Sequence, residues 1–275
     1  MLGKVDFVVL SLVVITNSVH LNSENLSEYP LPLTGLDILD ADPFIVGGSA
    51  ASLGQFPYQA ALRTPAGLFF CGGVIISNRW VVSAAHCTIN RDLIISFRVV
   101  VGTINHSSGG TEFTLSRVVN HPNYNAGTIA NDISLTQVAG TFVFSGTVNQ
   151  VAMGSAFLGG GVNGNVAGWG ATATGGQPTT QLRWFQTTSI TNADCRNRFN
   201  AAGETRAASL VFDHKMCSFT RNGQGFCQGD SGGGFVSNNV VHGIVSWNIP
   251  CGRGVPDVYD RISSHRSWIN SITGL

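Results

Sequence analysis

The sequence lacks several features that would place it in a specialised class of protein. Charged residues make up only 11% of its 275 positions and apolar residues make up 43%, a balance that is typical of a globular chain and excludes a disordered one. The basic residues form no dense block, so we expect no binding of nucleic acid. No apolar run after the first 20 residues is long enough to span a bilayer, and we therefore expect a soluble mature protein without a membrane contact.

Cysteine is present, but never in the CxxC spacing of common metal sites. The six cysteines are scattered along the chain, which favours three disulfides over metal ligation, although the count alone does not choose among the pairings. Glu112 is the only acidic residue in segment 101–115, so we expect no structural calcium there. We expect no other metal and no cofactor.

The first 44 residues differ from the rest of the chain. Lys4 precedes an uncharged run from Phe7 to Thr16, which is the layout of a secretory signal peptide over residues 1–20; the alternative is a buried N-terminal strand. Residues 21–44 are polar and acidic and show no helical or strand period, and we expect a propeptide there.

The remaining sequence has the pattern of an all-β protein. From Ile45 onward, short β-branched and aromatic runs alternate with turns of Gly, Asn and Ser, a spacing that predicts a barrel or a sandwich. Near the end, the apolar residues Trp268, Ile269 and Ile272 suit a short terminal helix.

Five short strings point to a family. They are IVGG at 45–48, SAAHC at 83–87, NDISL at 131–135, GDSGG at 229–233 and SW at 246–247. Together, and in this order, they resemble the chymotrypsin–trypsin family of serine peptidases over residues 45–275. The resemblance implies two six-stranded antiparallel Greek-key barrels, about 45–150 and about 151–262, and a C-terminal helix at about 263–273.

The same strings contain the residue types needed for acyl transfer. A serine hydroxyl is a poor nucleophile near neutral pH and needs a base within hydrogen-bond reach. The resemblance implies a catalytic triad of Ser231 as nucleophile, His86 as base and Asp132 as the residue that orients the imidazole. It also implies an oxyanion hole formed by the backbone N–H groups of Gly229 and Ser231. The order His, Asp, Ser differs from that of the α/β-hydrolases and subtilisins.

The resemblance further implies how the cysteines pair. The expected disulfides are Cys71–Cys87, Cys195–Cys217 and Cys227–Cys251.

The IVGG string implies a zymogen. Cleavage after Phe44 would free an α-ammonium on Ile45, which would pair with Asp230 and shape the oxyanion hole. Trypsin-activated relatives carry Arg or Lys before the cleaved bond, so Phe44 implies a chymotrypsin-like activator or self-processing; trimming elsewhere, finished by a dipeptidase, is the alternative. Residues 1–44 contain no cysteine, and we expect the propeptide to leave.

Specificity is the property that the sequence determines least. Alignment to the family places Gly225 at the pocket floor and Asp257 on a wall, a swap that resembles the broadly cleaving collagenolytic brachyurins of crabs and insects. Phe226 and Asn248 add bulk, which favours smaller or medium-sized apolar side chains. The other expected substrate-binding residues are Gln228, Ser246 and Trp247. We expect chymotrypsin-like or broad specificity.

Two further features concern the environment of the protein. Lys4 and Lys215 are the only lysines, and arginine keeps its charge at a pH where lysine loses it, which suggests an alkaline compartment such as an insect midgut; compositional drift is the alternative. Asn105 begins an N-x-S sequon, the acceptor sequence for a surface glycan.

The leading hypothesis is thus a secreted, monomeric, digestive endopeptidase. Its expected partners are protein or peptide substrates, an activating peptidase and protein inhibitors. One alternative is a non-catalytic homologue that binds partners through the same fold, although all three triad residues are present. The other is a regulatory or venom peptidase.

Overall fold

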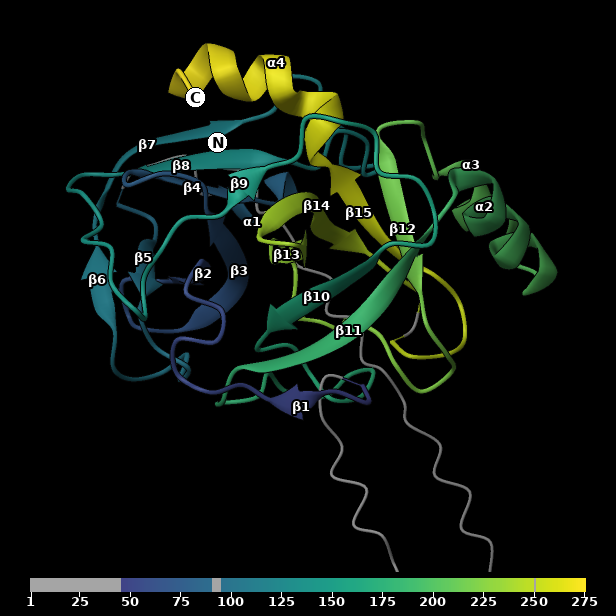
Figure 1. Cartoon of the computed structure of the whole chain (residues 1–275), viewed down its shortest axis with the longest axis horizontal. Coiled ribbons are helices and arrows are strands. Elements are labelled where there is room, and N and C mark those ends of the chain that lie inside the picture. The colour runs from purple at the N-terminus through teal and green to yellow at the C-terminus, as the bar shows by residue number, and fades with distance from the viewer. Residues whose placement is uncertain (1–45, 91–94, 250) are drawn as a thin grey trace, which may run out of the picture. The chain divides into compact units, whose positions relative to one another are not determined.

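The computed structural model describes residues 46–90, 95–249 and 251–275. The predicted signal peptide, the propeptide, Phe44 and Ile45 lie outside the described residues. All described residues belong to one compact unit, which is built mainly of β-strands in two sheets (Figure 1).

The first sheet is antiparallel and has the strand order β6-β5-β2-β3-β4-β8-β7. Its strands are β2 (Gln59–Arg63), β3 (Phe69–Ile75), β4 (Trp80–Ser83), β5 (Arg98–Val101), β6 (Thr111–Phe113), β7 (Leu115–Asn120) and β8 (Ser134–Val138). The two edge strands, β6 and β7, are separated only by Thr114, so one bent segment passes from one edge of the sheet to the other. Counted as one strand, this segment gives the six strands that the resemblance predicted.

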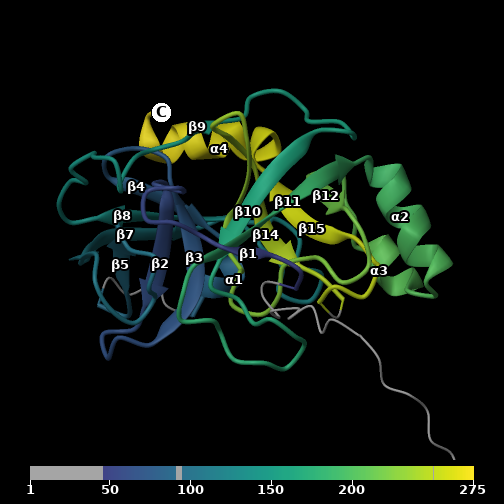
Figure 2. The same ribbon diagram turned by 60° about the horizontal axis from the view of Figure 1, so that its bottom comes forward.

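The second sheet is a closed barrel. It runs β11-β10-β13-β14-β15-β12, and β12 pairs back with β11. Its strands are β10 (Asn163–Gly168), β11 (Arg183–Ile190), β12 (Lys215–Phe219), β13 (Gly234–Ser237), β14 (Val240–Trp247) and β15 (Asp257–Arg261), with β1 (Ser49–Ala50) added beside β11 and β9 (Ala152–Met153) beside β14. Figure 2 shows β10 and β11 crossing in front of the other strands of this barrel. The all-β prediction of two barrels is confirmed.

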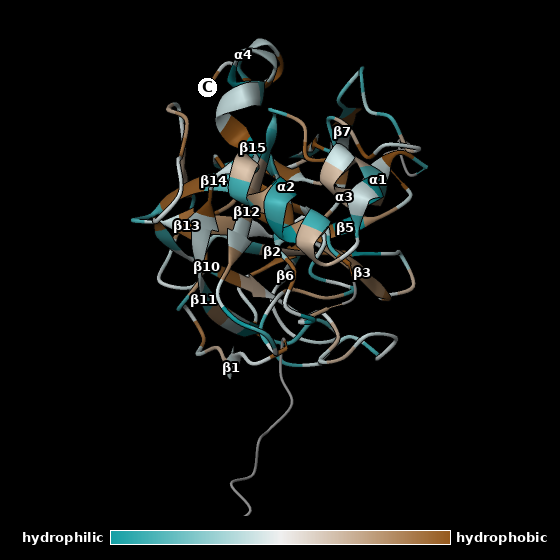
Figure 3. Ribbon diagram, turned by 90° about the vertical axis from the view of Figure 1, so that its right-hand side faces the viewer, coloured by the Kyte–Doolittle hydropathy of each residue, from teal (hydrophilic) through white to brown (hydrophobic). Residues whose placement is uncertain are grey.

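Four helices complete the described part. They are α1 (Ala85–Thr88), α2 (Asn192–Ala201), α3 (Thr205–Ser209) and α4 (Ile262–Thr273). The short helix α1 follows β4 directly and carries His86. Helix α2 is largely hydrophilic (Figure 3) and buries Cys195 and Phe199. The C-terminal helix α4 has the place predicted for it and buries Ile262 and Ile269 in the core.

Apolar side chains of both sheets form the interior. The largest cluster of buried residues runs through the first sheet and includes Trp80, Phe97 and Leu135, while Phe235 and Tyr259 lie in a cluster inside the second barrel. Within the described residues, no helix combines the length and the apolar character that crossing a membrane requires.

Candidate active site

His86 and Asp132 come together where α1 meets the loop that precedes β8. The imidazole Nδ1 lies 2.7 Å from Asp132 Oδ2, and the backbone N–H of His86 donates to Asp132 Oδ1 at 2.8 Å. Because an ionised carboxylate only accepts hydrogen bonds, Nδ1 carries the proton and Nε2 keeps the free lone pair of a base. Asp132 is completely buried, and the hydroxyl of Ser246 donates to its Oδ2 at 2.7 Å. The carboxylate is therefore held from three directions.

The loop that carries Ser231 docks against β3 and against the end of β4, the strand that leads to His86. Gly72 N–H donates to the carbonyl of Ser231 at 2.8 Å, and Ser83 Oγ donates to the carbonyl of Gly72 at 2.8 Å. Gly232 has φ +83°, and a Cβ at this position would meet Ser83 Oγ and the carbonyl of Gly72. Only glycine therefore allows this close approach. This close approach places Ser231 and His86 at the junction of the two sheets.

Comparisons with known proteins agree with this geometry. The Trypsin family matches residues 45–269. The chain belongs to the trypsin family. It is 36% identical over 236 residues to "Trypsin, alkaline B" of Manduca sexta, an alignment that covers 82% of this chain and 90% of that protein. It is 40% identical over 214 residues to "Achelase-1" of Lonomia achelous, covering 74% and 95%, and 33% identical over 232 residues to "Trypsin delta" of Drosophila melanogaster, covering 84% and 88%.

The family assignment confirms the resemblance seen in the sequence, and this trypsin-family protein is a serine endopeptidase. The individual roles of Ser231, His86 and Asp132 stay predictions. Among the described residues no hydrogen bond joins the Ser231 hydroxyl to the imidazole. Such contacts are often long without substrate and tighten when substrate binds.

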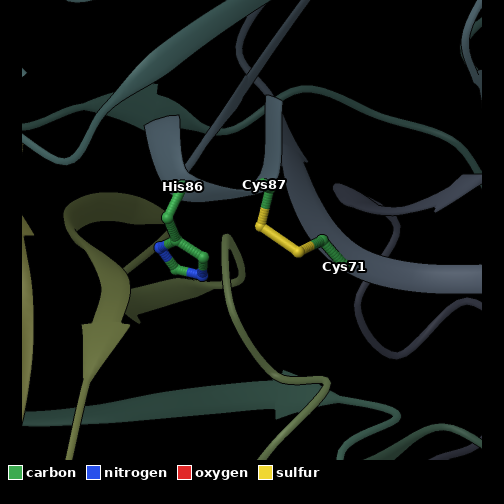
Figure 4. Close-up of side chains that lie close together, drawn as sticks. All are labelled: Cys71, His86 and Cys87. Atoms are coloured by element: carbon green, nitrogen blue, oxygen red, sulfur yellow. A yellow bond between two sulfur atoms is a disulfide. The ribbon is translucent and has the colours of Figure 1, made fainter. Parts of the chain in front are cut away.

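Three disulfides connect the cysteines as the resemblance implied: Cys71–Cys87, Cys195–Cys217 and Cys227–Cys251. The first lies beside the imidazole of His86, as Figure 4 shows, and ties α1 to β3. Potential ligand atoms of Cys71, His86 and Cys87 lie within 4.8 Å of one another. Both sulfur atoms are already bonded to each other, so this cluster offers no thiolate to a metal.

Next to Ser231, the segment expected to form the oxyanion hole has a backbone suited only to glycine. Gly229 has φ +99°, and a Cβ there would lie 3.1 Å from the Cα of Gly170. Asp230 turns inward, where its carboxylate accepts hydrogen bonds from the backbone N–H groups of Gly170 at 2.7 Å and Cys227 at 2.9 Å. Burial raises the pKa of Asp230 to about 7, against the lowering effect of these two hydrogen bonds. A cation beside the carboxylate would offset the free-energy cost of burying it in its ionised form.

The expected specificity pocket contains a buried acid. Asp257 lies against Gly225, where an added Cβ would be 3.0 Å from one carboxylate oxygen and 3.1 Å from the other. A larger residue at position 225 would thus collide with Asp257. Burial, together with the charge of Asp230, raises the pKa of Asp257 to about 8, although hydrogen bonds from Phe226 N–H and from Asn248 act in the opposite direction.

Asn248 and Phe226 add their bulk in different places. The amide of Asn248 donates to the carbonyl of Phe226 at 2.5 Å and to Asp257 Oδ1 at 3.4 Å, so it bridges the two segments expected to form the pocket walls. The ring of Phe226 packs into the second barrel, 5.4 Å from the ring of Tyr259. The bulk of Phe226 therefore lies in the core.

The buried acid gives the stability of the protein a definite pH dependence. A carboxyl whose folded-state pKa is raised stabilises the fold below its ordinary pKa of about 4, and this contribution is lost as the pH rises through about 8. We expect Asp257→Asn to abolish this loss. At pH 9 the variant should have a higher free energy of unfolding than its parent, by about 5–6 kcal/mol, with little difference at pH 4.

Urea unfolding at both pH values measures this effect, and an inactive Ser231→Ala background prevents self-digestion. Glu112→Gln serves as the matched control because the side chain of Glu112 is 55% exposed. Equal stability of Asp257→Asn and its parent at pH 9 would contradict the prediction.

A hollow of about 370 Å³ borders the other side of the site. Leu68, Phe69 and Pro178 are among its lining residues, and a Cβ on Gly229 would be 3.6 Å from the side chains of both Phe69 and Pro178. The hollow therefore lies next to the expected oxyanion hole, and its exposed apolar edge includes Leu68.

The remaining predicted residues have varied surroundings. Trp247 stacks on Phe199 with ring centroids 5.6 Å apart, and Gln228 is exposed while its carbonyl accepts from Ala171 N–H at 2.7 Å. Asn105 is half-buried and its side-chain oxygen accepts from Ser107; its glycosylation stays a prediction.

The sequence assigned no site role to Lys215 or Asp260, although Lys215 is the only lysine after Lys4. Both contact the site, as described below.

Proposed function

We propose that this chain is the secreted zymogen of a digestive serine endopeptidase with chymotrypsin-like or broad specificity. Ser231 attacks the peptide carbonyl, and His86 takes the hydroxyl proton and later gives it to the leaving amine. Asp132 holds the imidazole, and the N–H groups of Gly229 and Ser231 receive the oxyanion. The observation that carries the proposal is the contact between the buried carboxylate of Asp132 and the partly exposed imidazole of His86, beside the docked Ser231 loop.

Cleavage within the chain is supported by space on the leaving-group side. The hollow beside Gly229 has apolar walls from Leu68, Phe69 and Pro178, and it suits side chains that follow the cleaved bond. An enzyme that binds substrate on both sides of that bond acts on the interior of polypeptides.

Activation by a new amino terminus is supported by Asp230 and by the surroundings of Val46. Asp230 is fully buried, and in the described part of the chain its carboxylate accepts hydrogen bonds only from backbone N–H groups. Val46 packs against Ala171 and the Cys227–Cys251 disulfide, and its carbonyl accepts from Gly225 N–H at 3.2 Å. An ammonium on the preceding residue, Ile45, provides a cation that can pair with the buried carboxylate of Asp230 when the Phe44–Ile45 bond is cut.

Specificity follows from Asp257 and Asn248. At neutral pH the raised pKa keeps Asp257 protonated in an empty pocket, which suits apolar groups, whereas an entering Arg or Lys favours the ionised form. The amide of Asn248 bridges the two walls of the expected pocket, at Phe226 and at Asp257. Medium-sized substrate side chains therefore fit the pocket more readily than long ones. The surface charge also fits an alkaline setting, since Lys215, the only lysine among the described residues, is completely buried.

The proposal is tested with protein matured at Ile45, an active-site serine probe and a mixed peptide library. We expect a fluorophosphonate to label Ser231 and the enzyme to cut after Phe, Tyr and Leu, with slower cuts after Arg. Asp257→Asn should abolish the cuts after Arg and keep the others. Protein extended by one Ala before Ile45 is the matched control, and it should be poorly labelled.

Two results would contradict the proposal. A matured protein that is neither labelled nor able to cut any peptide would favour the non-catalytic homologue. If the uncut chain were labelled as fast as the matured protein, the proposal that the chain is a zymogen would be wrong.

A further inference from the structure

Lys215 lies in a fully buried position that satisfies every hydrogen of its ammonium group. Its exposed fraction is 0%, and Nζ donates to the carbonyl of Ile129 at 2.5 Å, to Ser246 Oγ at 3.1 Å and to Asp260 Oδ2 at 2.5 Å. Lys215 and Asp260 are direct partners across β12 and β15. A buried ammonium is costly unless it is paired and fully hydrogen-bonded, so these contacts explain how the charge is tolerated.

The pair touches Asp132 through a hydroxyl whose direction is fixed. Ser246 follows Val245 where the β14–β15 register shifts, and its Oγ lies 2.7 Å from Asp132 Oδ2. An ammonium can only donate, so Ser246 accepts from Lys215 and its single proton must point at Asp132. Asp260 reaches the same residue through the backbone, because its Oδ2 accepts from Asp132 N–H at 3.0 Å.

The loop before Asp132 needs to be held. Ile129 and Asn131 both have φ +53°, a left-handed conformation that is unfavourable for a β-branched residue such as Ile. The carbonyl of Ile129 is bound by Lys215, and the N–H of Asn131 donates to His214 Nε2 at 3.1 Å. Side chains of the second barrel thus hold the backbone that presents Asp132 to His86.

We propose that Lys215 and Asp260 are positioning residues that orient Asp132 through the Ser246 hydroxyl and through the backbone of residues 129–132. The inference rests on the proposed triad role of Asp132. It assigns the buried pair a part in catalysis beyond the stability of the fold. Neither residue touches the reacting atoms.

The ionisable groups around the pair set the conditions of the test. Those facing it are His86 on α1, Asp132 and Tyr124 in the loops before β8, His121 after β7, His214 before β12 and His265 on α4. Burial lowers the pKa of His214 and lowers that of His121 to about 4, while burial and the charges of Asp132 and Asp260 raise the pKa of Tyr124 to about 12. His121 and Tyr124 therefore stay neutral from pH 5 to about 9 and do not shape an activity profile there.

Opposite charge changes at the pair should move the activity profile in opposite directions. Lys215→Met removes a positive charge and favours the protonated imidazole of His86, so the acid limb of kcat/KM should move up by about 0.5–1 pH unit. Asp260→Asn removes a negative charge, and the limb should move down by a similar amount. In both variants we expect kcat to fall on the order of tenfold with KM unchanged.

The measurement is a pH profile of kcat and kcat/KM on a peptide substrate, normalised by burst titration of active sites. Arg206→Met is the matched control, since it also removes one positive charge but from an exposed position on α3, and it should behave as wild type. Wild-type kcat and limb positions in both pair variants would overturn the proposal. The proposal would also be overturned if the acid limb moved in the same direction in both variants, by amounts that follow their loss of stability.

The double variant Lys215→Met/Asp260→Asn covers the case in which the single variants do not fold, because it leaves no unpaired buried charge. The acid limb of its kcat/KM profile should return to the wild-type position. Its kcat should remain on the order of tenfold below that of the wild type, since the Ser246 hydroxyl is no longer oriented. A wild-type kcat in this variant would overturn the proposal. Ser231→Ala separates the two levels: full activity of that variant would overturn the triad itself, whereas an inactive Ser231→Ala beside an unaffected pair would overturn only this inference.

Discussion

Replacing Ser231 by Ala is expected to lower kcat of the matured enzyme by about 10⁶-fold, with little change in KM. This magnitude is the one established for loss of the nucleophile in another Ser–His–Asp peptidase, a subtilisin. The physical reason is that the two serine hydroxyls described nearby, those of Ser83 and Ser246, are already engaged in other hydrogen bonds. The nearby hydroxyl of Ser83 is engaged with the carbonyl of Gly72, and that of Ser246 donates to Asp132.

Turnover of a peptide or ester substrate measures the loss, after titration with a protein inhibitor has shown that the variant still folds. The matched control is Ser209→Ala on α3, where an exposed serine loses the same hydroxyl and should keep wild-type kcat. Activity above a few per cent in Ser231→Ala would mean that another residue is the nucleophile.

Asp132→Asn is expected to lower kcat by about 10⁴-fold, which is the loss known for the same exchange in the trypsin triad. The contacts around Asp132 explain why the amide fails. One carboxylate oxygen faces His86 Nδ1 and the Ser246 hydroxyl, and the other faces the backbone N–H of His86. An amide has only one oxygen, so its NH₂ meets a donor in either orientation.

With the NH₂ group facing Nδ1, the imidazole must place its proton on Nε2 and can no longer accept one from Ser231. With the NH₂ group reversed, it opposes the backbone N–H of His86. The measurement is single-turnover acylation, and the fluorophosphonate labelling of Ser231 should slow in parallel. Asp194→Asn is the matched control because Asp194 is exposed on α2; a loss in Asp132→Asn no larger than in this control would contradict the assigned role.

The sequence was sufficient for the family and the fold because the evidence for them is local. Strings such as GDSGG place a nucleophile in a glycine turn, and Gly232 in the structure shows why no larger residue fits there. The alternation of short β-branched runs and turns predicted strands. The predicted six strands of the first barrel appear as seven because the chain bends at Thr114, and no residue pattern marks that bend.

The pocket was predicted less completely. Alignment placed Gly225 and Asp257 in it, and the structure puts them in contact. The direction of a side chain depends on neighbours that are distant in sequence. Phe226 packs beside Tyr259, and Asn248 reaches back to the carbonyl of Phe226; neither contact follows from the identity of the residue alone.

By itself, then, the sequence determined the family, the barrel architecture and the residues proposed for the triad, since short motifs carry those properties. Only the tertiary structure decided what surrounds Asp132. Lys215 and Asp260 are 45 positions apart and meet because β12 and β15 pair in one particular register. Ser246 is directed at Asp132 by its contact with a buried ammonium. The physical reason is that strand register and burial are collective properties of the folded chain, so a lone lysine in the sequence does not reveal which carboxylate it will meet.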